Sequence, residues 1–331
     1  MSTTSGISAP ERALTPGAVN ALADAGTALA RLDERLAASP PSVAAGWLSR
    51  ALLHEAAASA RLDGDLVDYD DLRLLDAGAL DRLPDPALGR AAQVLRLLRS
   101  AARRTPRQVF TPRRLAAMAD LTLRARAADR GDARPLPLVR LADPTEALAG
   151  LGVVLSPGNV EAWKGMPALL AAADVIARWH AHGVADLAGG PAGRALAAMW
   201  VARAGLTRSL QLMPSVGFLG HARGFRPDLR GEWPGHFLEA CRRAAEWGLG
   251  LHAELAGTRA RLLARHPARR SSSRMPALVE LVVETPVVAA PAVAARLGTS
   301  AYGARLLLDE LNGARSIVEI SGRGSHRVFA C

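Results

Sequence analysis

The sequence predicts a mainly α-helical protein, in which a large helical region is followed by a small C-terminal unit. Half of the 331 residues are hydrophobic, so a packed core can form. Aromatic residues make up only 4% of the chain, whereas alanine and leucine are abundant, a composition that favours helix over strand. Apolar residues also recur at helical spacing in long segments that end at prolines and glycines.

Prolines and glycines delimit the expected helices. A first helix runs from Ala18 to the Pro40-Pro41 pair, and a second from Ser42 to Gly64, where a left-handed C-terminal cap is expected. Further helices are expected over 85–104, 111–128, 167–182, 192–205 and 234–265. The segment 129–165 is interpreted as a long connection. Residues 1–16 are interpreted as a flexible N-terminus, so the helical domain spans 17–268.

The charge and the cysteine content of the chain limit the functional classes to which the protein can belong. The formal net charge is +10, but Lys164 is the only lysine, and such a preference for arginine together with abundant alanine is typical of a GC-rich genome. Charge alone is therefore weak support for nucleic-acid binding. Cys241 and Cys331 have no cysteine or histidine neighbours at zinc-ligand spacing, so no metal site is expected. Without a signal-like segment or a long apolar run, we expect a cytoplasmic protein that does not enter membranes.

A separate C-terminal unit is expected over 274–331, after the basic, serine-rich segment 265–274. A helix from Met275 is followed by a short second helix that ends at Gly298, and Thr299 and Ser300 then cap a third helix. The last residues, SIVEISGRGSHRVFA, have β-forming residues on both sides of a glycine-rich turn and predict a hairpin. This order of elements is that of a winged helix-turn-helix.

In such a unit the third helix enters the major groove and the hairpin contacts the phosphate backbone. Double-stranded DNA is therefore the expected partner, and a homodimer fits this interpretation because two-fold DNA sites favour pairs of readers. The alternative is a small trihelical module for protein contacts. The exposed candidates for DNA contact are Ser300, Tyr302, Arg305, Arg323, His326 and Arg327.

The stretch HAHGVADLAGGPAGR raises a different possibility, because it combines a base, an acid and a glycine-rich turn before a helix. It resembles the motif of the Fic family, His-Pro-Phe-x-Asp/Glu-Gly-Asn-Gly-Arg-x-Gly-Arg. The resemblance implies that His182 is the catalytic base and Asp186 the metal ligand. Gly189 and Gly190 would present N–H groups to a phosphate, with Arg194 assisting one turn into the helix.

Three departures weaken the enzymatic interpretation. Gly183-Val184 replaces the Pro-Phe pair, the asparagine and the first arginine of the motif are missing, and one extra residue separates His182 from Arg194. Each lost electrostatic contact of this kind can cost ~2.7–4 kcal/mol in a transition state. The Gly-Gly-Pro sequence is also explained by a tight turn without any ligand.

The resemblance extends beyond this stretch. Fic proteins that regulate themselves often carry a helix with Ser-x-x-x-Glu-Gly, and Ser59, Asp63 and Gly64 match that inhibitory-helix pattern with Asp in place of Glu. The segments ARLDGDLVDYDDLRLLDAG and RRSSSRMPALVELVVETPVV resemble an uncharacterised bacterial family, abundant in rhizobia, that joins a degenerate Fic-like region to a C-terminal helix-turn-helix.

Together these observations predict a Fic-like helical bundle without competent catalytic machinery, followed by a winged helix-turn-helix that binds DNA and regulates transcription. No cofactor is expected. The alternative is a divergent Fic-type nucleotidyl transferase that moves AMP onto protein hydroxyls, in which case ATP and Mg²⁺ would be required.

Overall fold

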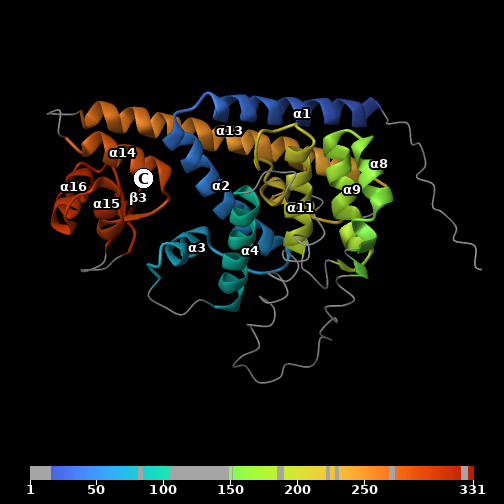
Figure 1. The fold of residues 1–331 in the computed structure, drawn as a ribbon, viewed down its shortest axis with the longest axis horizontal. Helices are drawn as coiled ribbons and strands as arrows, with labels where there is room; N and C mark the ends of the chain where they lie inside the picture. The colour runs from blue at the N-terminus through green and yellow to red at the C-terminus, as the bar shows by residue number, and fades with distance from the viewer. Residues whose placement is uncertain are drawn as a thin grey trace, which may run out of the picture.

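The computed structural model describes residues 16–80, 85–103, 149–150, 152–184, 190–220, 224–227, 231–267, 273–321 and 327–331. Two long helices, α1 (Pro16–Ala37) and α13 (Trp233–Arg265), lie side by side along one face (Figure 1). The remaining helices lie beneath this pair, and the C-terminal elements lie at one end (Figure 1). The helices between α1 and α13 are α2 (Pro41–Leu62), α3 (Tyr69–Asp76), α4 (Pro86–Ala102), α8 (Pro157–Lys164), α9 (Ala168–Ala181), α11 (Gly190–Arg203) and α12 (Pro214–Phe218).

The mainly α-helical fold is confirmed, and most of the expected helices begin and end within a few residues of their predicted bounds. Gly64 follows α2 with a φ of 95°, as expected for a left-handed cap. Asp85 caps α4, since its carboxylate accepts a hydrogen bond from the Leu88 N–H at 2.7 Å. The helix predicted over 111–128 lies outside the described residues.

Three short helices, α3, α8 and α12, were missed by the sequence analysis. Part of the predicted connection 129–165 is helical, because α8 occupies Pro157–Lys164, and this part of the prediction was wrong. The Ser156 hydroxyl caps α8, and its Trp163 is buried and donates a hydrogen bond to the Asp174 carboxylate at 2.7 Å. Helix α3 begins after Asp68, whose carboxylate accepts from the Asp70 N–H. Eight-residue helices depend on caps and packing more than on periodicity.

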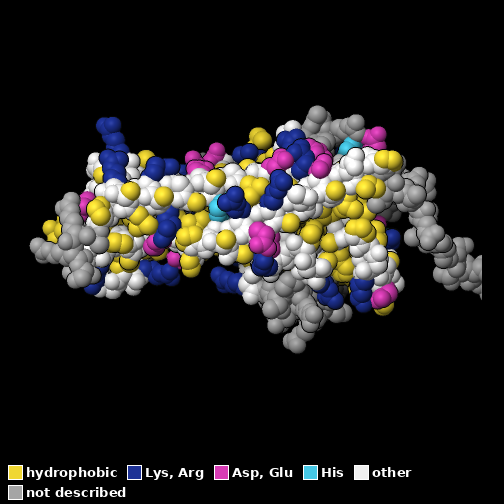
Figure 2. All heavy atoms as spheres, turned by 90° about the horizontal axis from the view of Figure 1, so that it is seen from above, with side chains coloured by type: hydrophobic (Ala, Val, Ile, Leu, Met, Phe, Trp, Pro, Cys, Tyr) yellow, Lys and Arg dark blue, Asp and Glu magenta, His cyan; other side chains and the backbone are white. Residues whose placement is uncertain are grey.

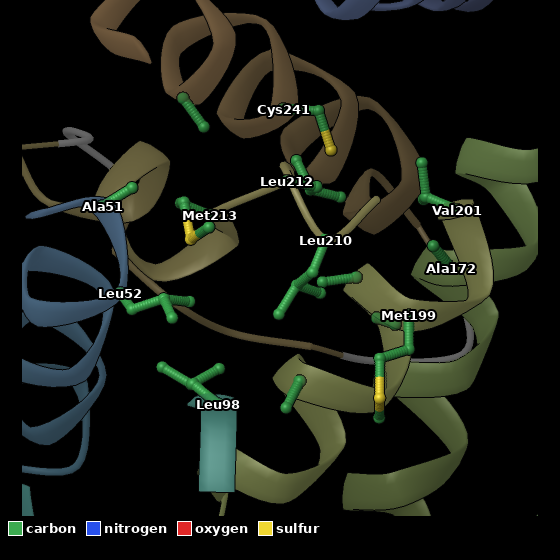
Figure 3. Close-up of a cluster of buried hydrophobic side chains, with 14 of the residues drawn as sticks. Ala51, Leu52, Leu98, Ala172, Met199, Val201, Leu210, Leu212, Met213 and Cys241 are labelled. Carbon is green, nitrogen blue, oxygen red and sulfur yellow. The ribbon is translucent and has the colours of Figure 1, made fainter. Parts of the chain in front are cut away.

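A continuous hydrophobic core occupies the space between α2, α4, α9, α11 and α13. Figure 3 shows Leu210, Leu212 and Met213 pointing from an extended segment into this core, between side chains of α2, α11 and α13. Two buried tryptophans bond to backbone across helices: Trp47 donates to the Gly248 carbonyl at 2.8 Å and Trp233 to the Ala173 carbonyl at 2.9 Å. Within the segment 204–213, residues 210–213 are therefore part of the core, whereas Ala204, Gly205, Arg208 and Ser209 are exposed.

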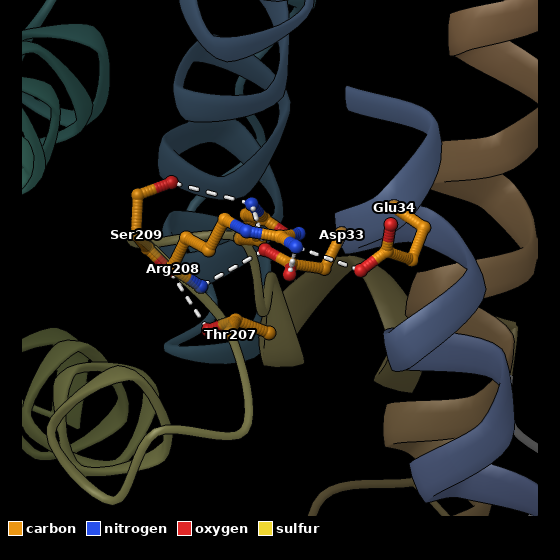
Figure 4. A network of polar contacts seen from close by, with 6 residues as sticks. Asp33, Glu34, Thr207, Arg208 and Ser209 are labelled. Atoms are coloured by element: carbon orange, nitrogen blue, oxygen red, sulfur yellow. Dashed lines mark hydrogen bonds and ion pairs between the residues drawn. The ribbon is translucent and has the colours of Figure 1, made fainter. Parts of the chain in front are cut away.

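Asp33 of α1 fixes the start of this segment (Figure 4). Its carboxylate accepts hydrogen bonds from the Arg208 backbone N–H at 2.9 Å, the Arg208 guanidinium at 2.5 Å and the Gln211 amide at 2.8 Å. Because Asp33 is buried, these donors satisfy its charge. The network joins α1 to residues 207–211.

The C-terminal module contains α14 (Met275–Glu284), α15 (Ala290–Leu297), α16 (Ala301–Gly313) and a three-stranded antiparallel sheet. The sheet has the order β1-β3-β2, with β1 at Val288–Ala289, β2 at Val318–Glu319 and β3 at Val328–Ala330. Val288 lies opposite Phe329, and Val318 lies opposite Ala330. The predicted pairing of the two terminal β segments is therefore present.

Helix α14 belongs to two cores. Leu278 and Val282 pack in the core of the C-terminal module, whereas Val279 and Val283 pack in the large helical core. The boundary predicted between 268 and 274 lies between two sets of helices, and α14 contributes side chains to the cores of both sets. The C-terminal unit is not independent of the helical body.

Arg50 of α2 holds the end of α14. Its guanidinium is buried and donates a hydrogen bond to the Val283 carbonyl at 2.8 Å, with longer contacts to the Val282 and Thr285 carbonyls. These carbonyls have no helical partner at a C-terminus, where a cation is also favoured by the helix dipole. Arg50 therefore acts as a C-terminal cap supplied by another helix.

A close helix contact reinforces this junction. A Cβ atom added to Gly46 of α2 would lie 2.2 Å from the Val283 carbonyl oxygen, so only glycine allows α2 and α14 to approach this closely. Nearby, the Glu280 carboxylate accepts hydrogen bonds from Ser42 and Arg259, and the Arg259 guanidinium lowers the pKa of Glu280.

None of the helices that the structure describes has the length and the apolar composition that a membrane span requires.

We predict that Gly46→Ala lowers the free energy of unfolding by about 1–3 kcal/mol, because the new methyl group overlaps backbone that cannot move independently. Gly26→Ala in α1 is the matched control: no atom lies within 4 Å of its added Cβ, so this variant should gain about 0.5–1 kcal/mol from helix propensity. Chemical denaturation of both variants measures the two effects. A Gly46→Ala variant as stable as the parent would contradict the close contact.

Candidate functional site

Arg194 lies one turn inside α11 and is almost completely buried, with 1% of its surface exposed. Its guanidinium donates hydrogen bonds to the Ser59 hydroxyl at 2.7 Å and the Ser59 carbonyl at 2.9 Å, and it forms an ion pair with Asp63 at 2.9 Å. It also lies over the ring of Phe225, 5.1 Å from the centroid. The structure therefore brings together residues from two separate sequence motifs.

The end of α2 is shaped for this contact. Ser59 and Asp63 are four residues apart and share one face of the helix end, which Gly64 then terminates. On the other side, Gly190 leaves room for the pair: an added Cβ would lie 2.6 Å from Arg194 Nη1 and 2.8 Å from Asp63 Oδ1. Gly190 was predicted as a phosphate-binding N–H donor, and the structure gives this glycine a packing reason as well.

One nitrogen of the Arg194 guanidinium takes no part in the contacts with Ser59 and Asp63. This nitrogen, Nη1, is buried and has no hydrogen-bond partner among the described residues. A buried donor without an acceptor is costly, and such atoms deserve an explanation. The start of α11 therefore combines a helix N-terminus with a spare cationic N–H, which is chemistry suited to an anion.

The remaining residues of the Fic-like motif are only partly described. His182 is exposed at the C-terminal end of α9, whereas Asp186 and Gly189 lie outside the described residues. No hydrogen bond or ion pair in the described part of the chain joins His182 to Arg194, and in that part no cluster of three acidic, histidine or cysteine residues is placed to hold a metal. A convergence of base, acid and arginine is thus not seen among these residues.

Glu55, one turn before Ser59, is a buried acid that the sequence analysis did not single out. Its carboxylate accepts hydrogen bonds from the backbone N–H groups of Ser215 and Val216, both at 3.1 Å. Burial raises the pKa of Glu55 to about 7, against the opposing effect of these hydrogen bonds and of Arg194. No periodic signal separates such an acid from an exposed one, so the sequence alone could not identify it.

The pKa of the neighbouring His54 is shifted in the opposite direction. Its ring stacks on Tyr69 at 4.0 Å between centroids and meets Trp247 edge-on at 5.1 Å. Burial and the nearby arginines, Arg50 first among them, lower the pKa of His54 from 6.5 to about 4. His54 is therefore a neutral packing residue near neutral pH.

The C-terminal module presents the first turns of α16 to solvent. Gly298 ends α15 with a φ of 58°, and the Arg274 guanidinium donates to the Leu297 carbonyl at 2.7 Å and to that of Gly298 at 2.5 Å. The Ser300 hydroxyl caps α16 by accepting from the Gly303 N–H at 3.0 Å. Side chains exposed on the following turns are Tyr302, Arg305 and Leu306.

Arg327 is tied within the module. Its guanidinium forms ion pairs with Glu319 of β2 at 2.6 Å and Asp309 of α16 at 2.8 Å, and it covers the ring of Phe329. Arg327 thus connects the sheet to α16 instead of projecting as an unpaired cation. Arg323 and His326, the other two predicted contacts of the hairpin, lie outside the described residues.

Comparison with known proteins adds three findings. Residues 275–330 match the family model described as "HTH DNA binding domain". The chain is 29% identical to the uncharacterized protein y4cF of Sinorhizobium fredii, over 92% of this chain and 94% of that protein. Its structure is similar to the crystal structure of a Fic family protein from Desulfovibrio desulfuricans G20, with a TM-score of 0.50, 13% sequence identity and 98% of each chain covered.

The chain has a Fic-like fold that ends in a helix-turn-helix module. The family match begins at the first residue of α14 and ends at the last residue of β3, and the bounds expected from the sequence were 274–331. At 13% identity the structural similarity concerns the fold and does not assign an activity.

We predict that Ser59→Ala combined with Asp63→Ala lowers the free energy of unfolding by about 3–5 kcal/mol, because it leaves a buried guanidinium without its main partners. Adding Arg194→Met to this double variant should restore at least about 1 kcal/mol, since the unpaired charge is removed as well. Urea denaturation of the three proteins measures both steps. A triple variant less stable than the double variant would show that the guanidinium does not depend on these partners.

A second prediction concerns the pH dependence of stability. The pKa of His54 is lowered by folding, so its contribution is present above 6.5 and is lost as the pH falls toward 4. Glu55 has the opposite effect on stability. Because folding raises its pKa, its contribution to the stability of the folded state is present below pH 4.5 and is lost as the pH rises through about 7.

The variant His54→Phe keeps a ring stacked on Tyr69 and removes the titration of His54, while the titration of Glu55 remains. Between about pH 7.5 and about pH 5, the parent should lose about 2 kcal/mol of stability relative to this variant. Denaturation at both pH values measures the difference, and parallel pH profiles for the two proteins would contradict a lowered His54 pKa.

Proposed function

We propose that this protein is a DNA-binding regulator of transcription, in which α16 enters the major groove of double-stranded DNA. The observation that carries the proposal is the match of residues 275–330 to a helix-turn-helix DNA-binding family, together with the capped and exposed start of α16. A short helix, a left-handed glycine turn and a capped third helix form the arrangement that DNA readers use.

The exposed side of α16 carries groups that read base edges. Tyr302 and Arg305 are three residues apart, and Leu306 follows Tyr302 by four, so the three side chains share one face. Arginine pairs with guanine N7 and O6, and an apolar side chain packs on the thymine methyl group. Arg305 has no ion-pair partner within the described part of the chain, so its guanidinium is available to DNA.

The other predicted contacts contribute in different ways. Ser300 starts α16 through its cap, and Arg327 holds the sheet against α16. Arg323 and His326 are proposed as contacts of a wing to the phosphate backbone. Basic side chains are distributed along the whole face shown in Figure 2, so the net charge by itself does not locate the DNA surface.

Two further features complete the proposal. A homodimer would present two α16 helices to the half-sites of a two-fold DNA sequence, and it would add to the limited surface that one small module buries. A regulator of transcription works beside the chromosome, which in a bacterial cell is in the cytoplasm.

We predict that Arg305→Ala weakens duplex binding by about 1–3 kcal/mol, or roughly 5- to 150-fold, because one guanidinium contact is removed. Fluorescence anisotropy on a duplex selected from a random pool measures the affinity. Arg96→Ala is the matched control, since Arg96 is an exposed arginine of α4, outside the module, and its loss should leave the affinity unchanged. Equal binding by the parent and Arg305→Ala would argue against α16 as the reader.

A second candidate function is anion binding at the start of α11, which the unused Nη1 of Arg194 favours. A phosphate bound by Gly190 and the Nη1 of Arg194 would lie beside the bonds that Nε and Nη2 of the same guanidinium make with Ser59 and Asp63. A nucleotide would then alter the contact between α2 and α11. Calorimetry with ATP and Mg²⁺ tests this candidate, and an absence of heat together with an unchanged melting temperature would exclude it.

The transferase alternative needs more than binding. His182 would remove the proton from a protein hydroxyl, Asp186 would hold Mg²⁺, and AMP would move to the hydroxyl oxygen with release of pyrophosphate. Transfer of label from ATP to protein that disappears with His182→Ala would support this alternative over simple binding.

A further inference from the structure

The turn after α16 has a strained backbone at an arginine. Arg315 has a φ of 53°, and in the described part of the chain it is the only non-glycine residue with a positive φ. The Ser316 N–H bonds to the Leu311 carbonyl and the Arg315 N–H to the Asn312 carbonyl, both at 2.8 Å. This is the Schellman ending of a helix, in which glycine is favoured at the position that Arg315 occupies.

Within the described residues, the side chain of Arg315 has no partner that would offset this strain. Three other arginines of the described module are engaged, namely Arg274 with carbonyls of the turn after α15, Arg296 with Glu284 and Arg327 with two carboxylates, whereas Arg305 has no ion-pair partner among the described residues. The guanidinium of Arg315 is exposed and makes no hydrogen bond or ion pair with the described residues. Strain at an exposed cation is better explained by a contact outside the chain than by the fold.

A second exposed cation, Arg265, lies on the other side of the junction with the helical body. His266, which follows α13, shares a hydrogen bond of 2.8 Å with the Ser316 hydroxyl. This bond joins the residues directly next to Arg265 and Arg315. Arg265 is exposed at the end of α13 and also lacks a partner in the described part of the chain. The end of α13 and α16 lie at the same end of the molecule (Figure 1).

We infer that Arg265 and Arg315 form a phosphate-binding pair that extends the DNA contact from the helix-turn-helix module onto the end of α13. The inference rests on the proposed DNA binding and adds a contact surface that includes the helical body. Two guanidinium groups whose neighbouring residues share a part-buried hydrogen bond suit the phosphate backbone, which carries no sequence information. The pair therefore contributes affinity and orientation, whereas Arg305 contributes sequence preference.

The test uses the full chain and two duplexes, one selected from a random pool and one scrambled. Arg315→Gly removes the charge and also relieves the strain, so its melting temperature should be equal to or higher than that of the parent. Its affinity for both duplexes should fall by the same factor. The slope of log K against log salt should decrease by about 1. Arg265→Ala should act likewise, and Arg305→Ala should instead reduce the preference for the selected duplex.

Arg96→Ala again serves as the control for general charge. If the parent binds duplex DNA and Arg305→Ala weakens it while Arg315→Gly and Arg265→Ala keep the parental affinity and salt slope, this inference is wrong and the proposed function stands. A lower affinity with an unchanged slope would also overturn it, since the residues would then act by shaping the turn. If the parent binds no duplex, both the proposed function and the inference fail.

Discussion

The buried polar contacts of α2 are the constraint on which the rest of the structure depends. In the middle of α2, Arg50 caps the last carbonyls of α14, and at the end of the helix Ser59 and Asp63 enclose Arg194 of α11. A buried charge is tolerated only where hydrogen bonds and carboxylates satisfy it. One helix therefore fixes both the orientation of the DNA-binding module and the start of α11.

This arrangement explains why the C-terminal module is not a free appendage. Val279 and Val283 of α14 fill the helical core, while Leu278 and Val282 fill the core of the module. Rotating α14 would expose apolar side chains on one side or the other and would break the Arg50 cap. Helix α16 thus belongs to a module that shares α14 with the helical body, and α2 contacts both α14 and Arg194 of α11.

The sequence was most informative where a local signal determines structure. The glycine turns at Gly64 and Gly298, the caps at Asp85 and Ser300 and the helical spacing placed most elements within a few residues. Short helices such as α8 were missed because packing stabilises them. The contact of Arg194 with Ser59 was also not predictable, since it joins residues 135 positions apart.

Local patterns were least informative about which charges are free. Arg327 was expected to meet DNA, but Asp309 and Glu319 engage it, whereas Arg315 looked unremarkable in sequence and has an unpaired guanidinium on a strained backbone among the described residues. Amide hydrogen exchange of the full chain, with and without duplex DNA, tests the central claim most directly. We predict protection in the first turns of α16 on DNA binding. Protection confined to other helices, with α16 exchanging at its free rate, would contradict the account.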